Sequence, residues 1–302
     1  MRVFDRATVR RHRDRAAAGL TRHDFLFREV ADRLADRLAD VARSFPSALD
    51  LGCHTGQFAE VVDGRGGIEH LVQTDLSPAM LRRGRGVRLA ADEEFLPFRP
   101  RSFDLVVSVL SLHWVNDLPG ALVQINRALK PDGLFLAAIL GGGSLPELRQ
   151  AWLTAETTLE SGASPHVSPF VDIRDAGGLL QRASFTLPVV DSDDIVASYA
   201  EPFTLMRELR GMGENNAVRQ RRRGFSRRQT MMAMADAYIS AFADAEQRVP
   251  ATFQVLYLTA WTPHESQQQP LRPGSAKSRL AEALGVPERS AGEKAAPDRT
   301  SD

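Results

Sequence analysis

Short apolar runs alternate with segments of helical periodicity along the first half of the chain. The apolar runs lie between turn residues, at positions 48–51, 71–75, 87–90, 103–109 and 134–139. Apolar residues recur every three or four positions before the first run and again at 118–129, which is typical of amphipathic helices. The sequence Lys-Pro-Asp-Gly at 130–133 predicts a turn between that helix and the next strand. Strands that alternate with helices favour an α/β fold, with a parallel sheet covered on both faces.

The second half of the chain is less regular. Helices are expected at 145–159, 173–182, 203–210 and 227–245, and strands at 185–190 and 252–261. We expect an N-terminal helical segment at 1–44 and a main domain at 45–265, with a helical insertion at about 200–248. The tail at 266–302 is rich in Gln, Pro, Ser and Lys, which predicts disorder from about Gln267.

Composition excludes several classes of protein. The 302 residues are 43% hydrophobic and 25% charged, with 38 basic and 38 acidic side chains. A neutral total argues against nucleic acid as a partner. No apolar run approaches the roughly 18 residues of a membrane span, and the N-terminus resembles neither a signal nor a transit peptide. We therefore expect a cytoplasmic protein with no transmembrane segment. The single cysteine, Cys53, excludes disulfides within the chain.

The most informative motif is Asp50-x-Gly52-x-x-x-Gly56, which follows the first apolar run. Glycines there allow a tight turn and let a ligand approach the backbone. A second acid, Asp75, ends the next run, where such folds hold ribose hydroxyls. Asp50 would repel a pyrophosphate, but it suits the cationic amino group and sulfonium of S-adenosyl-L-methionine (SAM). The motif therefore predicts a SAM site rather than one for NAD or ATP, with a ligand-free Rossmann turn as the alternative.

Several further stretches resemble the family of mitochondrial complex I assembly factor 5. They lie at 91–98, 103–108, 110–119, 129–133, 164–170, 211–215 and 249–254. The central ones are shared with the wider BioC-like class I methyltransferases, whereas Ser-Pro-His at 164–166 and Gly-Met-Gly-Glu at 211–214 are more particular to the assembly factor. The resemblance covers nearly the whole chain. Since no transit peptide is recognised, the chain looks like a bacterial relative of this family, and the resemblance implies that any membrane association would be peripheral, through a partner. It implies a Rossmann-like class I SAM-dependent methyltransferase fold of seven strands, mostly parallel, with an antiparallel last strand.

The same resemblance implies roles for the candidate cofactor residues. Asp50, Gly52 and Gly56 would lie at the methionine end of SAM, and Asp75 would hold the ribose hydroxyls. Asp92 would accept from the adenine amino group beside the Glu93 backbone, and Ser108 and Leu110 would line the pocket. One position departs from the family pattern: His54 stands where a glycine is usual, which could crowd the cofactor.

Three residues are candidates for catalysis. His113 and Trp114 follow the central strand, where side chains face the substrate in doubly wound folds. His113 could act as a base or orient an arginine, and Trp114 could stack on a guanidinium. The alternative is that Trp114 packs on the sheet and His113 caps a helix. His166 lies in a proline-bearing loop and is either a substrate contact or a turn residue. The histidines lack the spacing of an iron site, so no metal is expected.

The resemblance implies a SAM-binding enzyme that modifies a protein side chain, an arginine, on a core subunit of respiratory complex I during assembly. Hydroxylation and methyl transfer both stay open, because fold does not decide chemistry. One alternative is a SAM-dependent O-methyltransferase of a small molecule or of an acyl-carrier thioester, as in BioC. Another is a non-catalytic SAM-binding assembly chaperone. The arginine-rich stretch 219–228 would dock an acidic protein, or is simply a solvated face.

Overall fold

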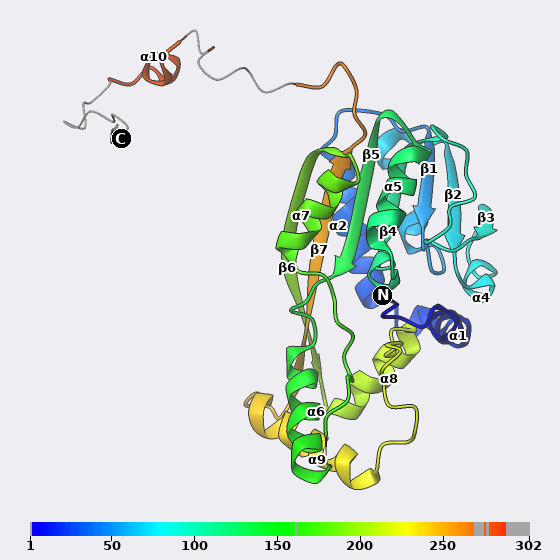
Figure 1. The fold of residues 1–302 in the computed structure, drawn as a ribbon, viewed down its shortest axis with the longest axis vertical. Coiled ribbons are helices and arrows are strands. Elements are labelled where there is room, and N and C mark those ends of the chain that lie inside the picture. Colours follow the sequence, from blue (N-terminus) through cyan, green and yellow to red (C-terminus); the bar gives the residue numbers. More distant parts are fainter. Residues whose placement is uncertain (1, 161, 269–274, 276–277, 288–302) are drawn as a thin grey trace, which may run out of the picture. The chain divides into compact units, whose positions relative to one another are not determined.

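The computed structural model describes residues 2–160, 162–268, 275 and 278–287. Within them, seven strands form one sheet in the order β3-β2-β1-β4-β5-β7-β6 (Figure 1). The strands are β1 (Ser47–Leu51), β2 (His70–Asp75), β3 (Val87–Ala90), β4 (Phe103–Val109), β5 (Leu129–Leu140), β6 (Thr186–Tyr199) and β7 (Val249–Trp261). The first five pair in parallel, and β7 is antiparallel to both of its neighbours. The predicted Rossmann-like class I methyltransferase fold, with its antiparallel last strand, is confirmed.

Helices cover both faces of this sheet because its central strands are apolar on both sides. Leu105 and Val107 of β4 join the core beneath α2 (Phe25–Ala39), whereas Val106 joins the core beneath α5 (Leu118–Ala128) and α7 (Ile173–Arg182). The apolar side of α2 that meets the sheet, which includes Val30, Leu34 and Leu38, is fully buried. The helical spacing of these residues in the sequence predicted this helix.

A two-stranded ribbon extends the sheet beyond its central strands. β7 pairs with β5 as far as Val255, but its pairing with β6 continues to Val249. Three helices gather around this ribbon, past the carboxyl ends of the central strands: α6 (Pro146–Leu159), α8 (Pro202–Met212) and α9 (Arg228–Phe242) (Figure 1). The last two are the helices expected between the final strands. They form, with α6, a wall opposite the carboxyl edge of the sheet.

The N-terminal segment crosses the same edge. α1 (Arg6–Ala16) is capped by Asp5, whose carboxylate accepts from the backbone N–H of Thr8. A short turn, η1 (Leu20–Arg22), leads from it into α2. α1 packs against α8 and against α4 (Pro78–Leu81), the short helix that follows β2. This placement brings the helix over the ends of β2 and β4.

Two local expectations from the sequence are wrong in their boundaries. The segment 130–133 is not a separate turn but lies inside β5, where the pairing with β4 shifts register and Asp132 has a φ of 61°. The strand expected at 185–190 runs on to Tyr199 because it pairs with β7 along its whole length.

The tail is a separate part of the chain. Residues up to His264 form one compact unit, and those from Glu265 onward form a second. The second unit contains one short described helix, α10 (Leu280–Leu284). Most of the tail predicted to be disordered lies outside the described residues, so that prediction stays untested.

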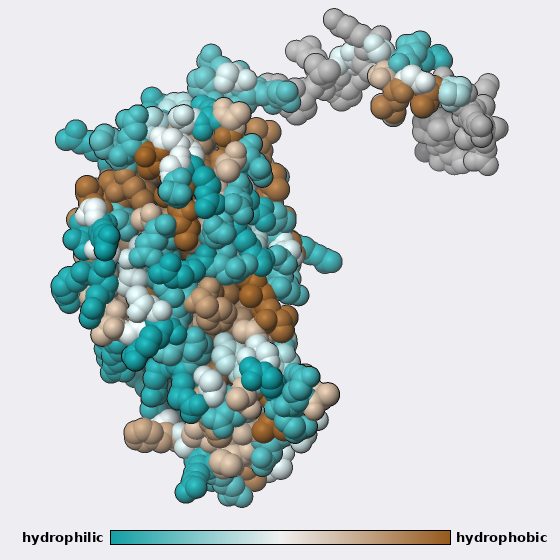
Figure 2. Space-filling model, turned by 180° about the vertical axis from the view of Figure 1, so that it is seen from behind, coloured by the Kyte–Doolittle hydropathy of each residue, from teal (hydrophilic) through white to brown (hydrophobic). Residues whose placement is uncertain are grey.

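The face shown in Figure 2 is largely hydrophilic, with smaller apolar areas between the polar ones. Among the helices of the described part, none combines the length and the hydropathy of a membrane span.

Candidate functional site

The predicted glycine turn joins β1 to α3 (Gln57–Val61) at the carboxyl edge of the sheet. Gly52 and Gly56 have φ of 74° and 99°, which side chains with a Cβ rarely adopt. A Cβ on Gly52 would also lie 2.0 Å from the hydroxyl oxygen of Ser111. Glycine is therefore required here both by conformation and by the close approach of the loop that follows β4.

Asp50 lies at the end of β1 and is completely buried. Neither of its carboxylate oxygens has a hydrogen-bond partner among the described residues. Burial, with the nearby charge of Asp75, raises the pKa of Asp50 to about 8. An unpaired buried carboxylate is unfavourable, and a cationic ligand group would satisfy it.

Asp75, at the end of β2, holds the adjoining turns together. Its Oδ2 accepts from the His54 backbone N–H at 3.1 Å, and its Oδ1 accepts from the Ser77 N–H at 2.7 Å. These contacts fix the carboxylate at the end of β2, where the sequence predicts an acceptor for the ribose hydroxyls. A further partner of Asp75 comes from outside the sheet.

That partner is Arg13 of α1, which the sequence did not single out. Its side chain is fully buried, and Nη1 lies 3.1 Å from Asp75 Oδ2 and 3.0 Å from Glu93 Oε1. Its Nη2 donates to Ser111 Oγ at 2.9 Å. A signal was present in the sequence: Arg13 shares with Val9 and Ala16 the buried stripe of an otherwise solvated helix.

Glu93 links this arginine to a second one. Its Oε1 accepts from Arg13 and Ser111, and its Oε2 accepts from Arg6, which also contacts Asp92 at 2.6 Å. The two guanidinium groups hold the pKa of the fully buried Glu93 down, to about 2, against the effect of burial. The predicted adenine-side residues, Asp92 and Glu93, are therefore clamped by the N-terminal helix.

His54 occupies the loop position where a glycine was expected. It has a φ of 52° and is buried, with its ring 4.3 Å from that of Phe27. Its Nε2 lies 3.1 Å from the carbonyl oxygen of Val109. Burial and the charge of Arg13 lower the pKa of His54, so the ring is neutral at physiological pH. The imidazole fills space between the glycine turn and α2.

The two residues predicted to line the pocket after the central strand behave differently. Ser108 is fully buried and its hydroxyl donates to the Leu51 carbonyl at 2.7 Å. Ser108 therefore ties β4 to β1, and its predicted pocket-lining role stays a prediction. Leu110, with a φ of 45°, does line a cavity.

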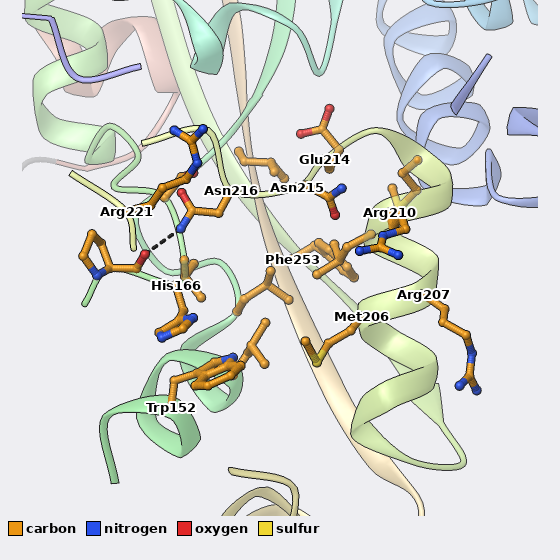
Figure 3. A pocket seen from close by; sticks show the side chains of 18 of the residues that line it. Trp152, His166, Met206, Arg207, Arg210, Glu214, Asn215, Asn216, Arg221 and Phe253 are labelled. Carbon is orange, nitrogen blue, oxygen red and sulfur yellow. Dashed lines mark hydrogen bonds between the residues drawn. The ribbon is translucent and has the colours of Figure 1, made fainter. Parts of the chain in front are cut away.

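That cavity, of about 570 Å³, lies between the carboxyl edge of the sheet and the helices of the ribbon (Figure 3). Its walls are mostly apolar, and they include Phe27, Leu110, Trp152, Met206 and Phe253. Arginines also line it: Arg207, Arg210, Arg221 and Arg222. In Figure 3, Arg207, Arg210 and Arg221 lie around the apolar side chains, so the cavity combines an apolar interior with a basic border.

Glu214, in the segment after α8, is the one carboxylate among the residues that line the described cavity. Its Oε2 accepts from Trp114 Nε1 at 2.8 Å and lies 3.1 Å from His113 Nε2. Its Oε1 is buried, with no partner in the part of the chain that the structure describes. Burial raises the pKa of Glu214, but the hydrogen bond from His113 and the charge of Arg13 outweigh it, so the pKa is lowered. The group is therefore an ionised carboxylate with one unpaired oxygen.

His113 and Trp114 lie behind this carboxylate rather than on the cavity wall. Both belong to η3 (Leu112–Trp114) and are almost fully buried. Trp114 packs edge-on against Phe4 at 5.3 Å, and the Leu140 N–H approaches His113 Nδ1 at 3.5 Å. A proton on His113 Nε2 directed at Glu214 fits this arrangement. The structure thus brings His113 and Trp114, two of the predicted catalytic residues, together at Glu214. The sequence had singled out Glu214 only as part of the motif at 211–214.

His166 does line the cavity, on the side away from Glu214 (Figure 3). Its ring stacks on Trp152 at 3.7 Å, with 4° between the planes. Its Nε2 lies 2.7 Å from Glu156 Oε1. These contacts fix the loop 164–170 against α6.

Within the described residues, no three histidine, cysteine, aspartate or glutamate side chains gather as a metal site would need.

Comparison with known proteins agrees with this architecture. A family model described as a methyltransferase domain matches residues 49–137. The phosphoethanolamine N-methyltransferase 2 of Haemonchus contortus, solved with SAM, is 16% identical. It aligns over 82% of this chain and 57% of that one with a TM-score of 0.51, a likeness that shows the fold alone.

Two groups of relatives extend over nearly the whole chain. The mitochondrial arginine-hydroxylase NDUFAF5 of Danio rerio is 44% identical, over 93% of this chain and 89% of that protein. The malonyl-[acyl-carrier protein] O-methyltransferase of Laribacter hongkongensis is 38% identical, over 89% and 94%. The chain therefore belongs to the family of methyltransferase-fold enzymes that includes the arginine hydroxylase NDUFAF5.

Proposed function

We propose that the protein is a SAM-binding enzyme that modifies an arginine side chain on a subunit of respiratory complex I. The observation that carries the arginine assignment is the unpaired, buried oxygen of Glu214 at the cavity wall. The relatives named arginine hydroxylase, at 44% identity, support the same substrate class.

The cofactor pocket fits SAM by the chemistry of its residues. The unpartnered Asp50 suits the cationic amino group of the methionine end. Asp75 suits the ribose hydroxyls, and Asp92 suits the adenine amino group. Bound SAM would supply an activated methyl group, which suffices for methyl transfer, whereas hydroxylation would take its oxygen atom from a separate two-electron oxidant such as dioxygen with a reductant. The protein's contribution is to hold these groups at the carboxyl edge of the sheet, next to the cavity.

The cavity fits an arginine side chain in both of its parts. The apolar walls can pack along the three methylenes, as arginine stems pack along apolar surfaces. The Oε1 of Glu214 can then accept from the guanidinium, a charge-assisted hydrogen bond in a site shielded from water. In this proposal, His113 and Trp114 position Glu214, and His166 holds the opposite wall.

Glu214 also links the cavity to the cofactor pocket. Its charge acts on Arg13 and on His54, which border the predicted methionine end. A guanidinium held by Glu214 would therefore lie near the part of SAM where its chemistry occurs. This proximity is what an enzyme acting on arginine requires.

Peptide mass spectrometry of complex I subunits, from cells with and without the gene, tests this proposal. We expect an arginine peptide that gains the mass of one oxygen only when the protein is present. Gain of a methyl mass instead would make the protein an arginine methyltransferase. Glu214→Gln should abolish the modification, whereas Glu60→Gln, which changes an exposed carboxylate that does not line the cavity, should not. An unmodified set of subunits in wild-type cells would refute the proposal.

The basic border of the cavity favours a second candidate. Arg207, Arg210, Arg221 and Arg222 could attract an acidic acyl-carrier protein, and a 38% identical relative is a malonyl-[acyl-carrier protein] O-methyltransferase. In that case the gene should restore growth without biotin to an auxotroph that lacks its own O-methyltransferase. A Glu214→Gln variant that still restored growth would separate this function from arginine recognition.

A further inference from the structure

We propose that Arg13 is a cofactor-binding residue, whose guanidinium pairs with the α-carboxylate at the methionine end of SAM. The inference rests on the SAM binding proposed above and assigns a role to α1, which no cofactor motif of the sequence includes.

The first step is the position of Arg13. One side of its guanidinium holds the acids of the predicted ribose and adenine region, since Nη1 contacts both Asp75 and Glu93. The other side points toward the glycine turn, since Nη2 contacts Ser111 Oγ, the atom that a Cβ on Gly52 would meet. Arg13 therefore spans the pocket from the expected ribose end to the expected methionine end.

The second step is the unused hydrogen-bonding capacity of this guanidinium. Nε is buried and has no acceptor among the residues that the structure describes. Nη2 carries two hydrogens, of which Ser111 takes one. Nε and Nη2 form the edge by which arginine binds a carboxylate through two parallel hydrogen bonds. This edge keeps unpaired hydrogens among the described residues, whereas Nη1 is already paired with Asp75 and Glu93.

The third step is the charge of the ligand. The methionine end of SAM carries an ammonium and a carboxylate, and both need partners when they are buried. Asp50 is an unpaired acid that suits the ammonium. Arg6, the other arginine on the acids of this edge, is held by Asp92, Glu93 and the Trp114 carbonyl on the adenine side. Arg13 is the cation that remains for the carboxylate.

Glu93 makes this arrangement specific. It is fully buried and joins Arg6 to Arg13, so it keeps the Arg13 guanidinium in the pocket before a ligand arrives. A ligand carboxylate would then meet a cation already fixed in place, which reduces the ordering cost of binding.

Calorimetry with two ligands tests the proposal. S-adenosylhomocysteine carries the amino-acid end, and 5′-methylthioadenosine has the same adenosine and sulfur without it. For Arg13→Gln we expect affinity for S-adenosylhomocysteine to fall roughly 10- to 100-fold, the usual loss for a charge-assisted hydrogen bond, with little change for 5′-methylthioadenosine. Arg13→Lys keeps the charge but not the bidentate edge, so it should show an intermediate loss for S-adenosylhomocysteine alone.

Arg10→Gln is the matched control, because Arg10 lies on the exposed side of the same helix. It should leave both affinities unchanged. Equal losses for both ligands in the Arg13 variants would overturn the proposal, because they would show a purely structural role. Tighter binding of both ligands would overturn it in another way, since Arg13 would then block the pocket. A wild-type protein that bound neither ligand would refute the proposed cofactor itself. The Lys variant keeps the test valid if the Gln variant does not fold.

Discussion

The indole Nε1 of Trp114 donates to Oε2 of Glu214 across 2.8 Å, although the two residues are 100 positions apart. Trp114 follows the central strand, and Glu214 follows α8 of the ribbon. The contact therefore fastens the helical part of the molecule to the sheet at the border between the cofactor pocket and the cavity. It satisfies one oxygen of this buried carboxylate, and the other oxygen has no partner among the described residues.

Trp114→Phe isolates this hydrogen bond, because the new ring can keep its packing against Phe4. Loss of a donor to a charged acceptor should lower the free energy of unfolding by about 1.5–3 kcal/mol. It should also weaken binding of an arginine substrate more than binding of the cofactor, since Glu214 loses its orientation. Chemical denaturation and calorimetry measure the two effects. A variant with lower cofactor affinity and normal substrate binding would contradict the role given to Trp114.

Asp50→Asn should stabilise the fold at pH 7 while weakening cofactor binding. The folded pKa of about 8 lies above the ordinary value of 3.8, so folding favours the neutral acid. Stability from this group is present below pH 3.8 and is lost as pH rises toward 8. The amide avoids this loss, and the gain at pH 7 should be roughly 2–4 kcal/mol.

The comparison of Asp50→Asn with wild type is best made across pH. The difference in unfolding free energy should be small near pH 4 and should grow with pH. Calorimetry should show reduced affinity for S-adenosylhomocysteine, because the amide no longer pairs with the ammonium. A less stable variant at pH 7 would mean that Asp50 has a favourable partner in the unliganded protein.

Glu93→Gln should have the opposite effect on stability. Breaking a buried ion pair on one side typically costs about 3–5 kcal/mol, and Glu93 joins two arginines. Its folded pKa of about 2 lies below the ordinary 4.5, so its stabilisation is present above pH 4.5 and is lost as pH falls toward 2. The wild type should therefore lose stability over that range more steeply than the variant. Parallel acid-unfolding curves for the two proteins would contradict this account.

The sequence predicted the fold and the glycine turn well because both depend on local patterns. The strand periodicity of β4 and the order of Asp50, Gly52 and Gly56 need no knowledge of distant contacts. Arg13 and Glu214 were missed as site residues because their roles arise where α1 and the segment after α8 meet the end of β4. The hydrogen bond of Ser108 could not be predicted for a related reason: a strand residue faces one side or the other, and only the pairing with β1 decides that its hydroxyl meets Leu51.

His54→Gly tests whether the imidazole crowds the cofactor. Removing a buried ring that packs on Phe27 destabilises the protein, whereas glycine removes the backbone strain of a residue with a Cβ at a φ of 52°. The net loss of unfolding free energy should be about 1–3 kcal/mol. We expect affinity for S-adenosylhomocysteine to increase, since the loop gains space and backbone freedom. Calorimetry and thermal unfolding of the same samples measure both changes. Unchanged or weaker affinity would show that the imidazole lies clear of the ligand.

His166→Ala tests whether His166 only forms part of the cavity wall or acts directly in catalysis. The ring stacks on Trp152 and contacts Glu156, so its loss should loosen loop 164–170 and cost about 1–3 kcal/mol of stability. Substrate affinity should fall because the cavity loses part of its wall, while the rate at saturating substrate should change little. His166→Gln retains a polar group near Glu156 and should recover part of the stability. If either variant instead lowered the saturated rate more than about 100-fold with substrate affinity intact, as removal of a general base does, His166 would act directly in the chemistry.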